Sequence, residues 1–268
     1  MSWTFMSQID KIEEYKFERV YEFSNIVSML VMDLEDLKPY YPFDEEAFAE
    51  SATKFSKTSL LHIFTVSILM GFYREEFHDN GDCYDEDAYE KWCDIFHSYK
   101  VKFKRRRFDD EDENFFEDWF KLNEDSFFRL FLAVSNEVVH VLFGNMSFIV
   151  RFNLLMSNIV KNYNNENETR NIPFPKDRMN EDGTIIRCSI PQWVRKVVIY
   201  RDYGHCVFCG KDLTGINNQI EKANYDHIIP LKQYGVNDPC NIQLSCEDCN
   251  KKKGKGVILP QYKYQKLW

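Results

Sequence analysis

Two pairs of cysteines near the end of the 268-residue chain carry its clearest chemistry. CVFC occupies residues 206–209, and CEDC occupies residues 246–249. Two Cys-x-x-Cys pairs supply the four thiolates that tetrahedral zinc prefers, and four protein ligands leave no open position for water or substrate. The spacing therefore predicts a structural zinc site with these ligands: Cys206, Cys209, Cys246 and Cys249. The alternative is an oxidised disulfide pair or uncommitted thiols.

The segment between the cysteine pairs carries residues suited to acid–base and metal chemistry. It is 36 residues long, whereas a usual zinc ribbon has ~15–20 residues there. Asp226 and His227 are adjacent on an extended, β-branched stretch, where neighbours point to opposite faces unless the strand is distorted. Asn241 precedes the second cysteine pair, and Asn250 begins a predicted Lys-rich helix.

This arrangement resembles the HNH endonuclease family, whose ββα-metal fold places a hairpin and a helix around one divalent cation. The resemblance covers about residues 190–256 and rests on IPQWVRKVVIYRDYGHCVFCG together with the DH, Asn and CxxCN elements. It is the co-occurrence of these elements that is specific, because a stray DH or CxxC alone carries little weight. The resemblance implies a small zinc-stapled ββα domain at residues 191–268.

The resemblance also implies a role for each matching residue. His227 would be the general base that deprotonates the attacking water, and Asp226 would bind the catalytic cation. Asn241 would constrain the hairpin loop and help to orient the histidine, and Asn250 would be the second protein ligand of the cation. Mg²⁺ suits two oxygen ligands best, with Mn²⁺ as a substitute.

Structural roles are the alternatives for the same four residues. His227 could cap a polar surface of a strand, and Asp226 could be a hairpin carboxylate. Asn241 and Asn250 could serve in turns or at helix N-termini, where Asn is common. An imidazole with an unperturbed pKa near 6.5 can nevertheless accept a proton around neutrality, which favours the general-base role of His227.

Two further features lie beside these residues. Tyr234–Gly235 stands where family members often have paired glycines, so we expect a stiffer loop or one that stacks a base. A run of lysines follows Asn250, and we expect it to neutralise backbone phosphates without reading sequence. The alternative is a solvated helix face. These lysines are Lys251, Lys252, Lys253 and Lys255.

The charge of the chain is divided unevenly. The whole sequence has a net charge of -9, yet residues 188–268 contain 12 Lys/Arg against 7 Asp/Glu, a net of +5. Residues 1–187 contain the other 22 Lys/Arg against 36 Asp/Glu, a net of -14. A surface that faces a polyanion therefore belongs to the C-terminal third. With 44% hydrophobic residues the chain is neither disordered nor a small disulfide scaffold.

The preceding part of the chain predicts packed helices. Phe, Tyr and Leu recur at spacings of three and four over residues 7–163, with one apolar stripe at Ile26, Leu30, Leu34 and Leu37. The predicted fold class is mainly α, with an all-helical domain at residues 1–163, a linker or strap at residues 164–190 and the zinc-stapled domain. The basic run at residues 102–108 precedes an acidic one, so we expect the two to neutralise each other, with nucleic-acid contact as the alternative.

We therefore expect a metal-dependent HNH endonuclease that contacts the DNA backbone and hydrolyses phosphodiester bonds. The acidic helical domain would regulate it or dock a protein partner, in a prokaryotic defence or restriction-like setting. A non-catalytic zinc module that binds nucleic acid or protein, and a nuclease acting on RNA, are the alternatives. The apolar runs are too short or interrupted for a membrane span, and the first 17 residues lack a signal-peptide pattern, so a cytoplasmic protein is expected. The oligomeric state stays open.

Overall fold

The computed structural model describes residues 15–32, 45–162, 172–215, 224–254 and 256–257. It confirms the predicted fold class, because these residues are mainly helical and a two-stranded sheet lies near the C-terminus. The helices are α2 (Val20–Met32), α3 (Glu45–Thr53), α4 (Leu60–Asp79), α5 (Glu86–Ser98), α6 (Phe115–Leu122), α7 (Glu124–Phe143), α8 (Met146–Asn162), α9 (Gln192–Arg201) and α10 (Glu247–Lys253). The strands are β1 (Asn224–His227) and β2 (Ile242–Ser245).

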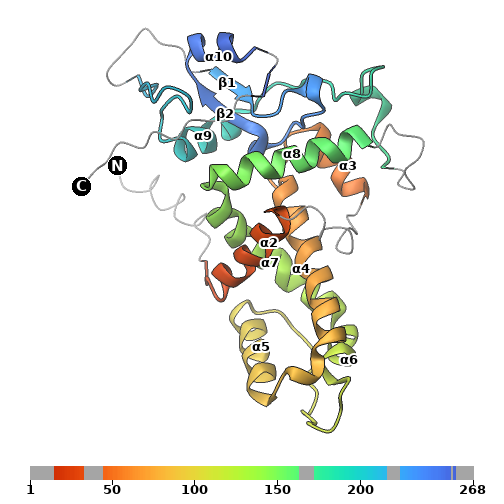
Figure 1. Cartoon of the computed structure of the whole chain (residues 1–268). Helices are drawn as coiled ribbons and strands as arrows, with labels where there is room; N and C mark the ends of the chain where they lie inside the picture. Colours follow the sequence, from red (N-terminus) through yellow and green to blue (C-terminus); the bar gives the residue numbers. More distant parts are fainter. Residues whose placement is uncertain (1–14, 33–44, 163–171, 216–223, 255, 258–268) are drawn as a thin grey trace, which may run out of the picture.

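The two long helices α4 and α7 form the centre of the helical part. They pack against each other, and α2 packs against both. Figure 1 shows α5 and α6 at one end of the molecule, whereas the sheet and α10 lie at the opposite end, beyond α8. Aromatic side chains fill the core between these helices, among them Phe77, Trp92 and Phe127, which contact one another edge to face.

Among the described residues, α7 is the one helix that is long and apolar enough to cross a membrane by length and composition. Its buried residues, which include Phe131, Val134 and Val138, belong to the core that α7 shares with α2 and α4. In this structure the apolar character of α7 therefore serves the packing of the helical part.

The apolar stripe of α2 differs from the predicted one by one position. Phe23, Val27 and Val31 are fully buried, whereas Ile26 and Leu30 are only partly buried beside the core. Both sets recur at helical spacing, so periodicity alone could not choose between them. Leu34 and Leu37 of the predicted stripe lie outside the described residues.

The basic run at residues 102–108 is paired with acidic side chains of the helical part. Arg105 pairs with Glu90 of α5, and Arg106 pairs with Asp112 at 2.8 Å. The Arg106 guanidinium also lies over the ring of Phe115, 5.1 Å from its centroid. These contacts agree with the expectation that the charges neutralise each other.

The C-terminal part is a small hairpin enclosed by two helices. β1 pairs with β2 in antiparallel register, so that Asp226 lies opposite Gln243 and His227 opposite Ile242. α9 packs on β2 and α10 on β1. A buried ion pair ties α9 to the hairpin, because Asp202 accepts a hydrogen bond from the Leu244 amide at 2.8 Å while its partner Arg201 donates to the carbonyl of Ile242.

The loop between β1 and β2 packs into the helical part rather than into the small hairpin core. Its apolar side chains belong to the same buried cluster as the helices, and they are Ile228, Ile229, Leu231, Val236 and Cys240. Polar contacts reinforce this packing: Asn237 donates its amide to the Ala52 carbonyl at 2.8 Å, and Asp238 accepts from the Leu60 amide at 2.8 Å. The division at residues 163 and 190 stays a prediction, and these contacts cross it.

The segment at residues 172–190, which we call the strap, connects the helical part to the C-terminal part along the chain. Ile172, Phe174 and Ile185 are buried in the core of the helical part. An isolated bridge between Met179 and Ile185, and a 2.9 Å hydrogen bond from the Ile186 amide to the Arg178 carbonyl, fold the strap back on itself. The strap is therefore held by apolar packing on the helical core and by hydrogen bonds within itself.

Gly235 in the loop permits a close backbone approach that no other residue type allows. A Cβ atom at this position would lie 2.0 Å from the Ile229 carbonyl oxygen, whereas one at Gly144 would meet nothing within 4 Å. The preceding Tyr234 adopts the left-handed conformation and packs against the core of the helical part. The Tyr–Gly sequence is thus accommodated by a strained tyrosine and an obligatory glycine.

We predict that Gly235→Ala lowers the free energy of unfolding by about 1–3 kcal/mol, because the clash is with backbone that cannot rotate away. Urea denaturation of the zinc-loaded protein measures this. Gly144→Ala is the matched control, and we expect it to change stability by no more than about 1 kcal/mol. Equal stability of the two variants would contradict the loop geometry.

Candidate zinc site and active site

The four cysteines of the two pairs gather at one point. Their sulfur atoms all lie within 4.8 Å of one another, and the Sγ atoms of Cys209 and Cys246 are 3.8 Å apart. Four thiolates bound to one zinc ion at ~2.3 Å stand roughly 3.8 Å from each other, so the cluster fits tetrahedral zinc. The set is complete without a substrate or water ligand, as expected for a structural site.

Local backbone structure places each cysteine pair. The first pair sits in a tight turn, closed by hydrogen bonds from the Cys206 amide to the Lys211 carbonyl and from the Gly210 amide to the Cys206 carbonyl. The second pair begins α10, with Cys246 at the N-cap. A 3.0 Å hydrogen bond from the Val207 amide to the Leu244 carbonyl joins the first turn to β2. Zinc would therefore fasten the start of α10 to the hairpin.

Sulfur crowding makes the four thiols costly to ionise together without a cation. Burial and the neighbouring sulfurs raise the pKa of Cys249. Burial acts in the same direction on Cys206, but backbone hydrogen bonds, from Cys246 and Cys209 among others, outweigh it and lower the pKa of that thiol. A bound zinc ion would supply the positive charge that four thiolates need.

His227 is enclosed at the end of β1. Its side chain is buried, with the residue only 1% exposed. Burial lowers the pKa of His227 to about 4, and the positive charges of Arg187 and Lys253 act in the same direction. The imidazole is therefore neutral near pH 7, the state in which it can accept a proton.

Asn237 determines which nitrogen of His227 carries the proton. The Asn237 carboxamide donates through Nδ2 to the Ile186 carbonyl at 2.8 Å and to the Thr53 carbonyl at 3.2 Å. Its oxygen therefore faces Nε2 of His227, 3.3 Å away, and accepts the proton of that nitrogen. Nδ1 keeps its lone pair and is buried without a hydrogen-bond partner in the structure.

Asp226 lies on the other face of β1, where a lysine of α10 covers it. The Lys253 ammonium is 2.5 Å from an Asp226 carboxylate oxygen and 2.5 Å from the His227 carbonyl oxygen. The lysine side chain is 1% exposed, against 17% for Asp226. Lys253 thus differs from the expectation of a phosphate-facing lysine, because its charge is used inside the protein beside the aspartate.

Asn241 holds the loop between the strands closed. Its carboxamide accepts from the Ile229 amide at 2.8 Å, and it donates to the carbonyls of Ile229 and Val236 at 3.0 and 2.9 Å. The Ile228 amide also donates to the Asn241 carbonyl at 2.7 Å. These bonds fix the backbone directly after His227, and a role of Asn241 in orienting the histidine stays a prediction.

Asn250 and the remaining lysines lie on α10. Asn250 is half-buried and three residues before Lys253, so the two side chains share one helix face. Lys251 is exposed and pairs with Glu247 at 2.5 Å, and Lys252 is exposed. Lys255 lies outside the described residues. The role of Lys251 and Lys252 as phosphate contacts stays a prediction.

The two residues predicted to hold the catalytic cation are of types that a hard divalent cation accepts. Asp226 offers a carboxylate and Asn250 a carboxamide, which are oxygen ligands that Mg²⁺ and Mn²⁺ accept. Gln243 lies opposite Asp226 in the hairpin, and both polar atoms of its buried carboxamide lack a hydrogen-bond partner in the structure. The Lys253 ammonium already places one positive charge against this carboxylate. The donor types suit a divalent cation, which would have to displace the Lys253 ammonium from Asp226.

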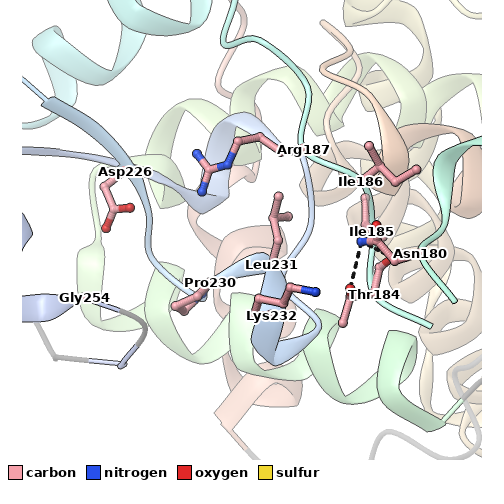
Figure 2. Close-up of a pocket in the computed structure, with 10 residues that line it drawn as sticks. All are labelled: Asn180, Thr184, Ile185, Ile186, Arg187, Asp226, Pro230, Leu231, Lys232 and Gly254. Carbon is pink, nitrogen blue, oxygen red and sulfur yellow. Dashed lines mark hydrogen bonds between the residues drawn. The ribbon is translucent and has the colours of Figure 1, made fainter. Parts of the chain in front are cut away.

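A pocket of about 360 Å³ opens beside Asp226. Strap residues, the loop after β1 and Gly254 at the end of α10 line it. Figure 2 shows the guanidinium of Arg187 extending toward the Asp226 carboxylate across this pocket. Sequence reasoning missed Arg187 and Asn237. Arg187 lies in the strap, Asn237 bonds to the strap and to α3, and no local spacing pattern marks either residue.

Residues 206–256 match the model of the family described as HNH endonuclease. The match begins at the first cysteine of the zinc cluster and contains Asp226, His227 and Asn250, and it confirms the resemblance noted in the sequence. The match supports a nuclease-type function in general. Searches of curated proteins and of solved structures found no match.

We predict that the purified protein binds one zinc ion per chain through the cysteine cluster. Cys246→Ser should lose most of this zinc and unfold at a lower temperature, because a structural zinc ion contributes directly to folding. Elemental analysis and thermal unfolding measure the two effects. Cys83→Ser, which changes an exposed cysteine outside the cluster, should retain the full zinc content. Full zinc in both variants would disprove the ligand assignment.

We also predict that His227 carries its proton on Nε2 at pH 7 in the absence of added Mg²⁺. Long-range ¹H–¹⁵N correlation spectra of labelled protein distinguish the two ring nitrogens, and His227→Ala identifies the signal. Asn237→Ala should abolish the fixed preference, because the acceptor for Nε2–H is removed. A protonated Nδ1 in the wild-type protein would refute the orientation of Asn237.

Proposed function

We propose that this protein is a divalent-metal-dependent endonuclease that hydrolyses DNA phosphodiester bonds. The observation that carries the proposal is the neutral His227 beside Asp226, with Nε2 hydrogen-bonded to Asn237 and Nδ1 left as a proton acceptor. The HNH family match over the same residues supports the reaction class. The net charge of +5 over residues 188–268 supports a polyanionic substrate.

His227 would act as the general base of hydrolysis. Nδ1 would take a proton from the attacking water, and Asn237 would hold the ring and stabilise the imidazolium through Nε2–H. A fixed tautomer matters because the opposite one would present a proton where a lone pair is needed. Asn241 would keep the loop after His227 in the conformation that this geometry requires.

Asp226 and Asn250 would hold the catalytic cation, which supplies stabilisation of the negative charge on the phosphate and the leaving oxygen. Mg²⁺ is the cation we propose, with Mn²⁺ as a substitute. Both residues offer oxygen donors, and Asp226 borders the pocket in which a phosphate could be seated. Zinc at the cysteine cluster would remain structural.

The Lys253 ion pair would have to yield during activation. Its ammonium bridges the Asp226 carboxylate and the His227 carbonyl, and the buried His227 ring is closed to solvent in this structure. A cation that binds Asp226 would compete with Lys253 for the same carboxylate. Displacement of Lys253 would free the Asp226 carboxylate for that cation.

The helical part would control the nuclease through the loop between the strands. Carbonyls of α3 bind the backbone and side chain of Asn237, and the amide of Leu60 at the start of α4 binds Asp238. A partner that moves α3 or α4 would thereby change the orientation of His227. A prokaryotic defence or restriction-like setting and a cytoplasmic location stay predictions.

Plasmid nicking tests the proposal. Zinc-loaded protein is dialysed free of other divalent ions, and supercoiled plasmid and a labelled RNA are incubated with increasing Mg²⁺. We expect cleavage of DNA that depends on Mg²⁺, and a decrease of at least about 100-fold in His227→Ala, because general-base catalysis contributes 10²–10⁴-fold. Titrating Mg²⁺ avoids EDTA, which would also remove zinc.

His78→Ala is the matched control, because His78 is exposed on α4. It should cleave like the wild-type protein. Equal plasmid cleavage by the wild type and His227→Ala would reject the assigned base and favour a non-catalytic zinc module that binds nucleic acid. Cleavage of RNA alone would change the substrate and keep the reaction.

A further inference from the structure

The pocket beside Asp226 receives side chains from outside the family match. Strap residues Asn180, Thr184 and Arg187 line it together with Asp226 and Lys232. The strap ends before residue 206, where the HNH match begins. The space next to the proposed cation ligand is therefore bounded by two separate parts of the chain.

Arg187 is the positively charged side chain of this pocket that pairs with no acidic group among the described residues. Lys232 pairs with Asp182 at 2.9 Å, and Lys253 is buried against Asp226. Arg187 is exposed, and no hydrogen bond or ion pair within the described part of the chain engages its guanidinium. Figure 2 shows that this group faces the Asp226 carboxylate across the pocket. Its charge also acts on His227, where it adds to the effect of burial.

The backbone that carries Arg187 is fixed relative to the general base. Ile185, two residues earlier, is buried in the core of the helical part. Ile186, the immediate neighbour, accepts a 2.8 Å hydrogen bond through its carbonyl from the same Asn237 carboxamide that contacts His227. The Asn237 side chain thus fixes the position of the Arg187 backbone relative to the His227 ring. The Arg187 guanidinium itself remains available to a ligand.

We propose that Arg187 binds the phosphate that is cleaved, so that the strap completes the nuclease active site from outside the HNH region. This inference rests on the proposed nuclease function. A phosphodiester seated between Asp226 and Arg187 would have the cation on one side and the guanidinium on the other. The nucleophilic water would approach from His227.

The chemistry of arginine suits this position. Its planar guanidinium donates two parallel hydrogen bonds to phosphate oxygens, and it stays charged at every relevant pH. Negative charge on those oxygens increases as the pentavalent transition state forms, and a fixed donor stabilises that state more than the ground state. Lysine offers a point charge without the paired geometry, so it should replace arginine only in part.

The test compares three strap variants of the full-length zinc protein. Arg187→Gln removes the guanidinium, Arg187→Lys keeps the charge, and Lys176→Gln removes an exposed strap charge that does not line the pocket. Initial rates of Mg²⁺-dependent cleavage are measured over a range of supercoiled plasmid concentrations. Thermal unfolding and zinc content are measured for each variant.

We expect Arg187→Gln to lower kcat/KM by about 100-fold with a clear part of the loss in kcat, as for the removal of one transition-state donor. Arg187→Lys should recover part of this loss, and Lys176→Gln should stay within about twofold of the wild type. Unfolding temperature and zinc content should be the same in all four proteins, because both substituted side chains are exposed.

Three outcomes overturn the inference, and they are distinguishable. If the wild type cleaves plasmid and Arg187→Gln equals Lys176→Gln, Arg187 is not a phosphate ligand and the nuclease assignment stands. If the wild type cleaves neither plasmid nor RNA at any Mg²⁺ concentration, the nuclease function fails and the role of Arg187 fails with it. A loss confined to KM would also overturn the transition-state role.

Discussion

The Asn237 carboxamide is the contact on which the candidate active site depends. Its two N–H bonds are taken by carbonyls of Thr53 and Ile186, so its oxygen has only one direction left, toward His227. A flipped amide would turn the oxygen toward two other oxygens and leave the imidazole facing N–H groups. Because two distant segments impose this orientation, the protonation site of the histidine is a property of the whole fold and not of the hairpin alone.

Two different kinds of interaction hold the hairpin at its two ends. The four-cysteine cluster fastens β2 to the start of α10, beside a buried apolar cluster that includes Val198, Ile242 and Leu244. The loop at the opposite end is held by apolar packing into the helical core and by backbone hydrogen bonds to α3 and α4. The buried Arg201–Asp202 pair adds a third anchor between them, because it bonds to both Ile242 and Leu244. Rigid support of this kind is what a site that must position a base and a cation requires.

The sequence was informative where chemistry is encoded in short spacing. Cys-x-x-Cys pairs, the adjacent Asp226 and His227, and the helical periodicity of the first part could be interpreted directly, and the fold class and the HNH resemblance were confirmed. The assigned roles of the individual site residues stay predictions. Asn237 and Arg187 could not be found in this way. Tertiary packing alone brings Asn237 to Thr53 and Arg187 to the pocket beside Asp226. Lys253 differs from its predicted role as a phosphate contact for a related reason. The sequence of a lysine run does not reveal which lysine faces the strand.

The loop between β1 and β2 shares one apolar cluster with the helices. The shortest fragment that can fold on its own must therefore include those helices. A fragment that starts at residue 191 would contain every residue of the family match, yet it would expose the five apolar loop side chains that the helices now cover. It would also lack the carbonyls that orient Asn237. A fragment cut at residue 191 would therefore be prone to aggregate and would not hold Asn237 in its orientation. The residues that match the family are fewer than the residues that fold together.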